Sequence, residues 1–197
     1  MNEADSALDR EDMQRLADGH DAGLDALMHR HAGRLRSYLF RLLQDDEDAD
    51  DLAQETFVRI YQHRRDFDPC HAFATWMYSI ASNLVKDRYR WRTRHPEVPL
   101  EPGNGSPGEP PGLVEVLPAP GQEPGDAALA HERAAAVQRA VAELPDDLRV
   151  PLVLAEFEER SHAEIAGILR CSAKAVEMRV YRARQVLRQR LARWLSA

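Results

Sequence analysis

The sequence predicts an all-α protein of two small helical domains joined by a flexible linker, and three observations lead to this expectation. Hydrophobic residues make up 44% of the chain and recur at helical spacing, with no alternating strand pattern of any length. Residues 96–125 hold nine of the twelve prolines and six of the ten glycines, a composition that neither keeps a helix nor buries a core. The chain of 197 residues is long enough for a small domain on either side of that segment. We therefore expect an N-terminal tail or short helix over 1–19, domains over 20–95 and 126–197, and the linker over 96–125 between them.

Three helices are expected in the first domain. Apolar and aromatic side chains recur every three or four residues over about 24–43, 49–61 and 73–85, the period of a helix with one buried face. The sequence around Pro69 interrupts this pattern between the second and third helices. The first domain is therefore predicted to be a small helical bundle.

Four helices are expected in the second domain, over about 126–142, 146–158, 161–169 and 173–193. Pro145 separates the first two. Ser161, with Glu164 three residues later, has the spacing of a capping box, in which each residue satisfies a backbone N–H group of the other. Ser172 is expected to cap the last helix.

Composition and motifs exclude several classes of protein. The N-terminus is acidic and has no apolar run, so it is not a signal peptide, and no segment has the roughly 18 consecutive apolar residues that membrane insertion needs. Two cysteines, Cys70 and Cys171, are too few for a disulfide framework and suit a reducing compartment. Because the chain has no HExxH, no CxxC and no Gly-rich phosphate loop, we expect no enzyme, no cofactor and no structural metal. The expectation is a cytoplasmic protein, and the sequence leaves open whether Cys70, His71 or Cys171 senses metal or redox state.

The formal net charge of −7 conceals an uneven distribution. Residues 84–95 carry five Lys and Arg against one Asp, and residues 173–193 carry seven against one Glu. Residues 45–55 carry seven acids and no base. Local basic patches on an acidic chain indicate separate surfaces for separate partners.

The last two predicted helices, 161–169 and 173–193, have the pattern of a helix-turn-helix, whose second helix enters the major groove of DNA. The early positions of that helix that its apolar stripe does not use are Lys174, Glu177, Met178, Tyr181 and Arg182. Arginine can read guanine, and glutamate can accept a hydrogen bond from cytosine. The alternative is a solvated cationic helix whose charge offsets its own C-terminal dipole.

Aromatic and basic residues are interleaved over 73–95. Tyr89 and Trp91 fall among five basic residues, and aromatics that stack on bases beside cations that bind phosphates are typical of single-strand binding. Asn83 is a candidate for lining a pocket that takes an unstacked base. The preceding helix, within 48–67, is acidic at its start and amphipathic, which suits a protein partner or simply a solvated face.

On these motifs the chain resembles a bacterial sigma factor of the sigma-70 class, in its extracytoplasmic-function group. DADDLAQETFVRIYQ looks like region 2.2 of that family, and FATWMYSIASNLVKDRYR looks like regions 2.3 and 2.4. LPDDLRVPLVLAEFEERSHAEIAGILRCSAKAVEMRVYRARQVLR looks like regions 4.1 and 4.2. One departure is Arg170, which stands where the family often has Gly and must accept the backbone conformation of the turn, which can be left-handed.

The resemblance implies a protein that binds core RNA polymerase and directs initiation at promoters, reading the −35 element as duplex and the −10 element as melted strand. It implies contacts with the clamp of the largest polymerase subunit at Asp48, Asp51, Gln54, Glu55 and Arg59. It implies −10 contacts at Asn83, Lys86, Arg88, Tyr89, Arg90, Trp91 and Arg92. It implies −35 contacts at Lys174, Glu177, Met178, Arg179, Tyr181, Arg182 and Arg184. Region 4 is further expected to touch the polymerase flap, and an anti-sigma factor is expected to hold the protein inactive.

Other functions explain less of the chain. A helix-turn-helix regulator that acts without joining polymerase accounts for the C-terminus but leaves residues 48–95 unexplained. An enzyme acting on nucleic acid lacks a metal or phosphate motif, and a structural adaptor would show no dependence on DNA or polymerase. The sequence does not fix the promoters, the inducing signal, the identity of the anti-sigma factor or the packing of the two domains when free.

Overall fold

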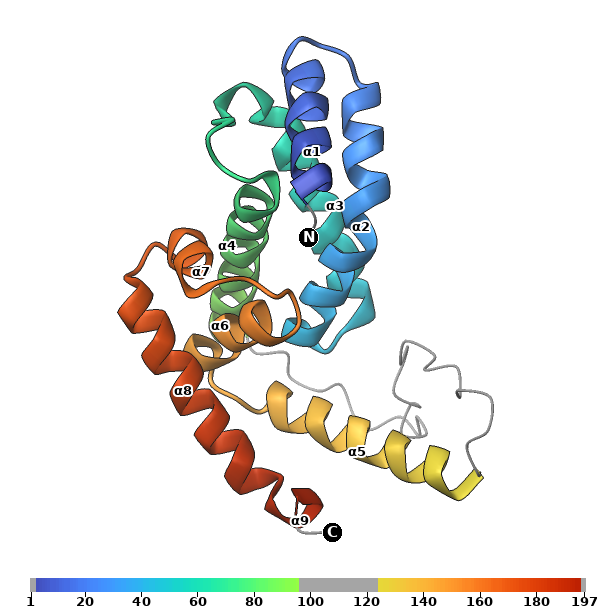
Figure 1. Cartoon of the computed structure of the whole chain (residues 1–197), viewed down its shortest axis with the longest axis vertical. Helices are drawn as coiled ribbons and strands as arrows, with labels where there is room; N and C mark the ends of the chain where they lie inside the picture. The colour runs from blue at the N-terminus through green and yellow to red at the C-terminus, as the bar shows by residue number, and fades with distance from the viewer. Residues whose placement is uncertain (1–2, 96–123, 196–197) are drawn as a thin grey trace.

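A computed structural model describes residues 3–95 and 124–195, and every regular element in these two ranges is helical (Figure 1). The first range forms α1 (Glu3–Ala17), α2 (Ala22–Leu43), α3 (Asp46–Gln62), the short 3-10 helix η1 (Arg64–Asp66) and α4 (Phe73–Arg94). The second range forms α5 (Pro124–Ala142), α6 (Asp146–Glu156), α7 (His162–Leu169), α8 (Ala173–Arg190) and α9 (Ala192–Leu195). The prediction of two all-helical domains is confirmed for these ranges. The predicted linker lies outside them, apart from its last two residues, which begin α5.

The predicted helix caps of the second domain are present. Ser161 and Glu164 form the complete capping box at the start of α7, and the Ser172 side chain accepts a hydrogen bond from the backbone N–H of Ala175 at the start of α8. Between the two helices Arg170 has φ of 52° and ψ of 50°, the left-handed conformation that the turn requires. A non-glycine residue therefore bears a modest backbone strain at the corner of the helix-turn-helix.

The N-terminal helix α1 is an integral part of the first domain. Met13 and Leu16 of α1 are almost completely buried against α2. The two helices approach so closely that a Cβ atom on Gly23 would lie 2.4 Å from the backbone oxygen of Asp12. A buried carboxylate, Asp9, accepts a hydrogen bond from Arg30 at 3.0 Å and further ties α1 to α2.

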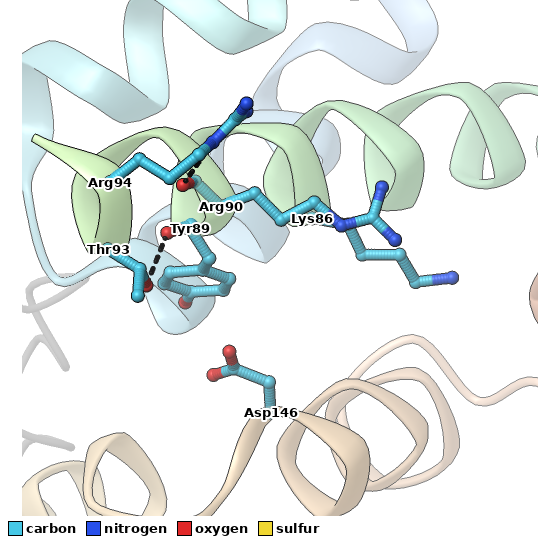
Figure 2. Close-up of a pocket in the computed structure, with 6 residues that line it drawn as sticks. All are labelled: Lys86, Tyr89, Arg90, Thr93, Arg94 and Asp146. Carbon is cyan, nitrogen blue, oxygen red and sulfur yellow. Dashed lines mark hydrogen bonds between the residues drawn. The ribbon is translucent and has the colours of Figure 1, made fainter.

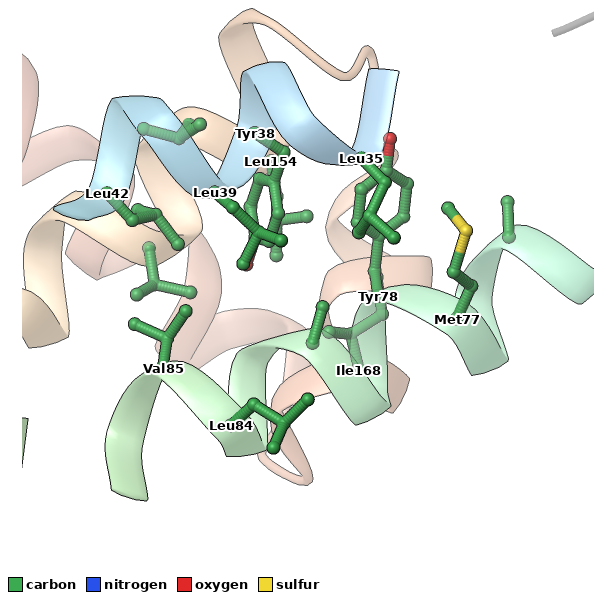
Figure 3. Packing of buried hydrophobic residues seen from close by; sticks show 14 of the residues in the cluster. Leu35, Tyr38, Leu39, Leu42, Met77, Tyr78, Leu84, Val85, Leu154 and Ile168 are labelled. Atoms are coloured by element: carbon green, nitrogen blue, oxygen red, sulfur yellow. The ribbon is translucent and has the colours of Figure 1, made fainter. Parts of the chain in front are cut away.

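The two domains pack against each other and share one continuous apolar core. Leu154 of α6 and Ile168 of α7 belong to the same buried cluster as Tyr38 of α2 and Tyr78 of α4 (Figure 3). The two tyrosine rings meet edge to face with centroids 5.0 Å apart, an arrangement that contributes about 1 kcal/mol beyond burial. Because α7 lies along α4 and α6 lies beside α2, the helix-turn-helix is docked on the first domain (Figure 1).

Candidate nucleic-acid interface

Helix α8 presents one face that takes no part in the core. Val176, Val180 and Ala183 bury the opposite side of the helix. At about 100° per residue, the five early positions predicted from the sequence fall within a single arc on the exposed side. These are Lys174, Glu177, Met178, Tyr181 and Arg182, all of them exposed. Since folding leaves this face uncovered, its mixture of cation, carboxylate and aromatic ring is free to contact base edges.

The two remaining residues of the predicted −35 set flank this face and have partners within the protein. Arg179 is partly buried, with its guanidinium 3.8 Å from the sulfur of Cys171 in the turn. Arg184 donates two hydrogen bonds to one carboxylate oxygen of Glu156 on α6, at 2.9 and 2.5 Å. Both arginines lie at the margin of the exposed face, a position that suits contact with a phosphate better than contact with a base edge.

Helix α4 carries a second stripe, partly or fully exposed, which changes from apolar to basic along its length. Trp76, Ile80 and Asn83 line a pocket of about 240 Å³ together with Arg59, His63 and Asp66. Farther along the same face follow Lys86 and Arg90, and both line a larger cleft of about 660 Å³. An aromatic and amide pocket followed along the same helix by cations is suited to a base and the phosphates that follow it.

Arg88 and Arg92 of the predicted −10 set point away from this stripe. Both guanidinium groups bind the carboxylate of Asp48, one to each oxygen, and Arg92 also lies 3.6 Å from Asp45. Asp48 itself is 7% exposed. The structure therefore brings together three residues that the sequence analysis assigns to two different partners, and their mutual contact ties the start of α3 to the end of α4.

Tyr89 is partly buried and has partners within the protein, whereas Trp91 is exposed. The Tyr89 hydroxyl donates to the backbone oxygen of Leu42 and accepts a hydrogen bond from Arg149 of the second domain at 2.9 Å. Burial is the main cause that raises the pKa of Tyr89 to about 12. Trp91 is 45% exposed and stacks on His95, with ring centroids 5.0 Å apart. Figure 2 shows Tyr89 in the larger cleft, facing Asp146 of α6.

Apart from the buried Asp48, helix α3 presents the predicted polymerase-binding residues along a stripe. Asp51 and Gln54 are exposed, whereas Glu55 and Arg59 are partly exposed and form an ion pair at 2.8 Å. Val58 is 48% exposed in the middle of the same stripe. An apolar side chain surrounded by polar ones on an open helix face is typical of a protein-binding surface.

Some residues of these surfaces were missed by the sequence analysis. Val58 follows Asp51 and Gln54 at helical spacing, so the same stripe could have included it. Trp76 falls within the apolar pattern of residues 73–85, which predicts a buried side chain, but it is only partly buried and lines the small pocket. His63 and Asp66 reach that pocket from the segment after α3, which no helical periodicity could place.

The described helices hold neither a membrane span nor a metal cluster. No helix within residues 3–95 and 124–195 is long and apolar enough to cross a membrane. In the same ranges no three His, Cys, Asp or Glu side chains gather in a way that could hold a metal ion.

Comparisons with known proteins agree with this geometry. The Sigma-70 region 2 family matches residues 27–95, and the Sigma-70, region 4 family matches residues 134–187. The RNA polymerase sigma-H factor of Pseudomonas aeruginosa is 31% identical over 91% of this chain and 91% of its own length. The ECF RNA polymerase sigma factor SigW of Bacillus subtilis is 35% identical over 77% of this chain and 80% of its own. Among solved structures, CnrH in complex with the cytosolic domain of CnrY is 26% identical, with a TM-score of 0.64 over 94% of this chain and 97% of that one.

Proposed function

Since this chain belongs to the extracytoplasmic-function group of sigma-70 factors, which direct RNA polymerase to promoters, we propose that three of its surfaces divide that task. The observation that carries the assignment is the uncovered face of α8, because it lies within the matched region 4 and is the side of the recognition helix that the core leaves free.

The α8 face reads the −35 element. Arg182 and Lys174 contact bases or phosphates in the major groove, and Glu177 restrains Lys174 through an ion pair at 3.0 Å. Arg179 and Arg184, at the margins of the face, contact the phosphates on either side. The position of Tyr181, 56% exposed between the cations, suits contact with a thymine methyl group.

The α4 stripe holds the melted −10 strand. The pocket lined by Trp76 and Asn83 takes an unstacked base, and Lys86 with Arg90 follows the phosphates. Trp91 offers a further exposed ring for stacking. Arg88 and Arg92 act indirectly, since their pairing with Asp48 fixes the end of α4.

The α3 stripe docks on the clamp of core polymerase. Asp51, Gln54 and Val58 form its exposed centre, and the Glu55–Arg59 pair borders it. Asp48 fixes the position of α3 against α4, because its carboxylate pairs with two arginines of α4. A protein with core polymerase and promoter DNA as partners works in the bacterial cytoplasm. An anti-sigma factor is a further proposed partner, supported by CnrH having been solved with the cytosolic domain of CnrY.

The test combines gel filtration with transcription. The purified chain is mixed with core RNA polymerase that carries no sigma factor, and the eluted complex is used for run-off transcription on genomic DNA. We expect co-elution and new start sites that share a promoter motif. A chain that shifts duplex DNA but ignores polymerase would instead be a helix-turn-helix regulator that acts alone.

A charge reversal on α3 tests the docking surface itself. Asp51→Arg is expected to prevent co-elution, because it replaces an exposed acid of the stripe by a cation. The matched control is Glu132→Arg, which makes the same change of charge at an exposed position of α5, away from the stripe. Co-elution of the Asp51→Arg variant as complete as that of the control would contradict the assignment of α3.

A further inference from the structure

The turn between α7 and α8 imposes a left-handed backbone conformation on a residue with a large side chain. The backbone N–H of Cys171 donates to the oxygen of Ala166 at 3.0 Å. The N–H of Arg170 donates to the oxygen of Gly167 at 3.4 Å. This pair of hydrogen bonds ends a helix through one residue of positive φ, which here is Arg170 at 52°. Glycine adopts this conformation without the steric cost of a Cβ atom, so the turn itself does not explain an arginine.

The side chain of Arg170 has no structural role within the described residues. Two other non-glycine residues there have a positive φ, Gln44 and Glu159. The Gln44 amide caps α2, because it donates hydrogen bonds to the backbone oxygens of Phe40 and Arg41 at 3.2 and 3.0 Å. Arg170 is exposed, and its guanidinium has no hydrogen bond or ion pair with any residue that the structure describes. Its charge is therefore available to a partner outside the chain.

The backbone of Arg170 lies close to the guanidinium of Arg179, at the margin of the α8 face. One nitrogen of the Arg179 guanidinium is 3.8 Å from the sulfur of Cys171 in the turn. Arg170 precedes Cys171, and consecutive Cα atoms are about 3.8 Å apart. The two arginines thus place two positive charges beside the start of the recognition helix, where the proposed function puts phosphates of the −35 duplex.

We propose that Arg170 binds a phosphate of the −35 duplex beside the one bound by Arg179, and that this contact accounts for an arginine where the backbone favours glycine. The inference deepens the proposed function of α8 and rests on it. Phosphate contacts carry no sequence information, but they fix the register of the recognition helix on the duplex. Arg170 therefore contributes to affinity at every promoter, whereas Arg182, on the face itself, contributes to the choice of promoter.

Arg170→Gly separates folding from binding, because the two are expected to change in opposite directions. Glycine relieves the left-handed conformation, so the melting temperature is expected to rise by roughly 2–4 °C. Holoenzyme with this variant is expected to bind a promoter fragment, identified by the run-off transcription, roughly three- to tenfold more weakly at about 0.1 M salt. The slope of log affinity against log salt is expected to become shallower by about one. Unchanged affinity and slope would overturn the proposal.

Three control variants separate the contact from backbone strain and from net charge. Arg170→Lys keeps a cation at the same position and is expected to retain most of the binding. Glu159→Gly relieves the same conformation, at φ of 53°, and is expected to raise the melting temperature without weakening binding. Arg133→Gln removes a positive charge from an exposed position of α5 and is expected to leave binding unchanged. If Arg133→Gln weakened binding as much as Arg170→Gly, the effect would be one of net charge and the contact would be refuted.

A second experiment identifies the phosphate. Single phosphates across the −35 element are replaced in turn by uncharged methylphosphonates, and wild-type and Arg170→Gly holoenzymes are compared on each fragment. We expect one position at which neutralisation weakens binding by the wild type but has little further effect on the variant, since one contact is lost only once. It should neighbour the position at which Arg179→Ala behaves in the same way. Equal losses for both holoenzymes at every position would contradict a contact between Arg170 and DNA.

The remaining outcomes separate DNA from polymerase and this inference from the proposed function. Reduced co-elution of Arg170→Gly with core polymerase, with an unchanged salt slope, would place the contact on polymerase and refute the proposal. If Arg182→Ala weakens promoter binding and Arg170→Gly does not, only the role of Arg170 fails. If neither variant weakens it, the assignment of α8 to the −35 element fails as well.

Discussion

Replacing Asp48 by asparagine tests whether this residue braces the first domain or contacts polymerase. In the folded protein each carboxylate oxygen accepts a hydrogen bond from one guanidinium, from Arg88 and from Arg92. The Asp48 side chain is 9% exposed, whereas those of Arg88 and Arg92 are 30% and 41% exposed. An asparagine of the same shape removes the charge and turns its NH₂ group toward one of the two donors.

The magnitude follows from these contacts. A hydrogen bond to a charged group contributes about 1.5–3 kcal/mol when buried, and the partial exposure of both arginines reduces this by roughly half. The two bonds together give an expected loss of about 1.5–3 kcal/mol in the free energy of unfolding. For a chain of this size such a loss lowers the melting temperature by roughly 3–12 °C.

Thermal unfolding and polymerase co-elution are measured together, with Asp51→Asn as the matched control. Asp51 lies on the same helix, three residues from Asp48, and is exposed. We expect Asp48→Asn to melt earlier but to co-elute with polymerase below its melting temperature. Asp51→Asn should melt like the wild type and co-elute less. Asp48→Asn with an unchanged melting temperature and lost co-elution would show that the brace does not exist and that Asp48 contacts polymerase.

Three further predictions concern other parts of the chain. Arg182→Ala is expected to weaken binding to the −35 element by about 1–3 kcal/mol, and so to reduce −35-dependent transcription roughly 5- to 150-fold, while co-elution with polymerase stays intact. Unchanged transcription at all promoters would argue against the α8 assignment. Gly23→Ala is expected to lower the melting temperature, because the added Cβ would lie 2.4 Å from the backbone oxygen of Asp12. Gly33→Ala, on the same helix, adds a Cβ with nothing within 4 Å and should be neutral or stabilising. Similar melting curves for the two variants would contradict the α1–α2 packing. Burial opposes ionisation of Glu164, but hydrogen bonds from the Ser161 side chain and backbone outweigh it and lower the pKa of the carboxyl below its ordinary 4.5. The ionised carboxylate therefore stabilises the fold above pH 4.5, and this stabilisation is lost as pH falls through the folded pKa. Replacing Glu164 by Gln should remove this part of the pH dependence of the melting temperature between about pH 3 and 6.

Local features of the fold could be predicted from the sequence because their causes are local. The capping box of Ser161 and Glu164 depends on residues three apart, and the left-handed Arg170 depends on a turn between two strongly patterned helices. The exposed face of α8 follows from its apolar stripe in the same way. Each of these lies within one or two helical turns, where spacing determines which side chains meet.

Long-range partners could not be predicted, since nothing in a single sequence pairs residues that are far apart along the chain. The resemblance implied −10 contacts for Arg88 and Arg92, and their pairing with Asp48, which precedes them by 40 and 44 positions, could not be read from the sequence. Tyr89 was assigned to stacking because it lies among cations, yet Arg149 covers it from the other domain. An arginine on a helix surface has the same sequence pattern whether its partner is a phosphate or a carboxylate.

The pairing of charges also explains how an acidic chain presents a basic surface. Asp45, Asp46, Asp48 and Asp50 form four of the seven acids in the run 45–55, and all four pair with arginines of α2 or α4. Three arginines, Arg36, Arg88 and Arg92, therefore offset most of the charge of these four acids at the junction of α2, α3 and α4. Within the described residues Lys86 has no ion pair, so its positive charge remains for a phosphate. Nucleic-acid binding depends on which charges the fold leaves unpaired on one face, rather than on the net charge of the chain. A net charge of −7 is therefore compatible with a basic α4 stripe, because most of the excess acid lies outside that stripe.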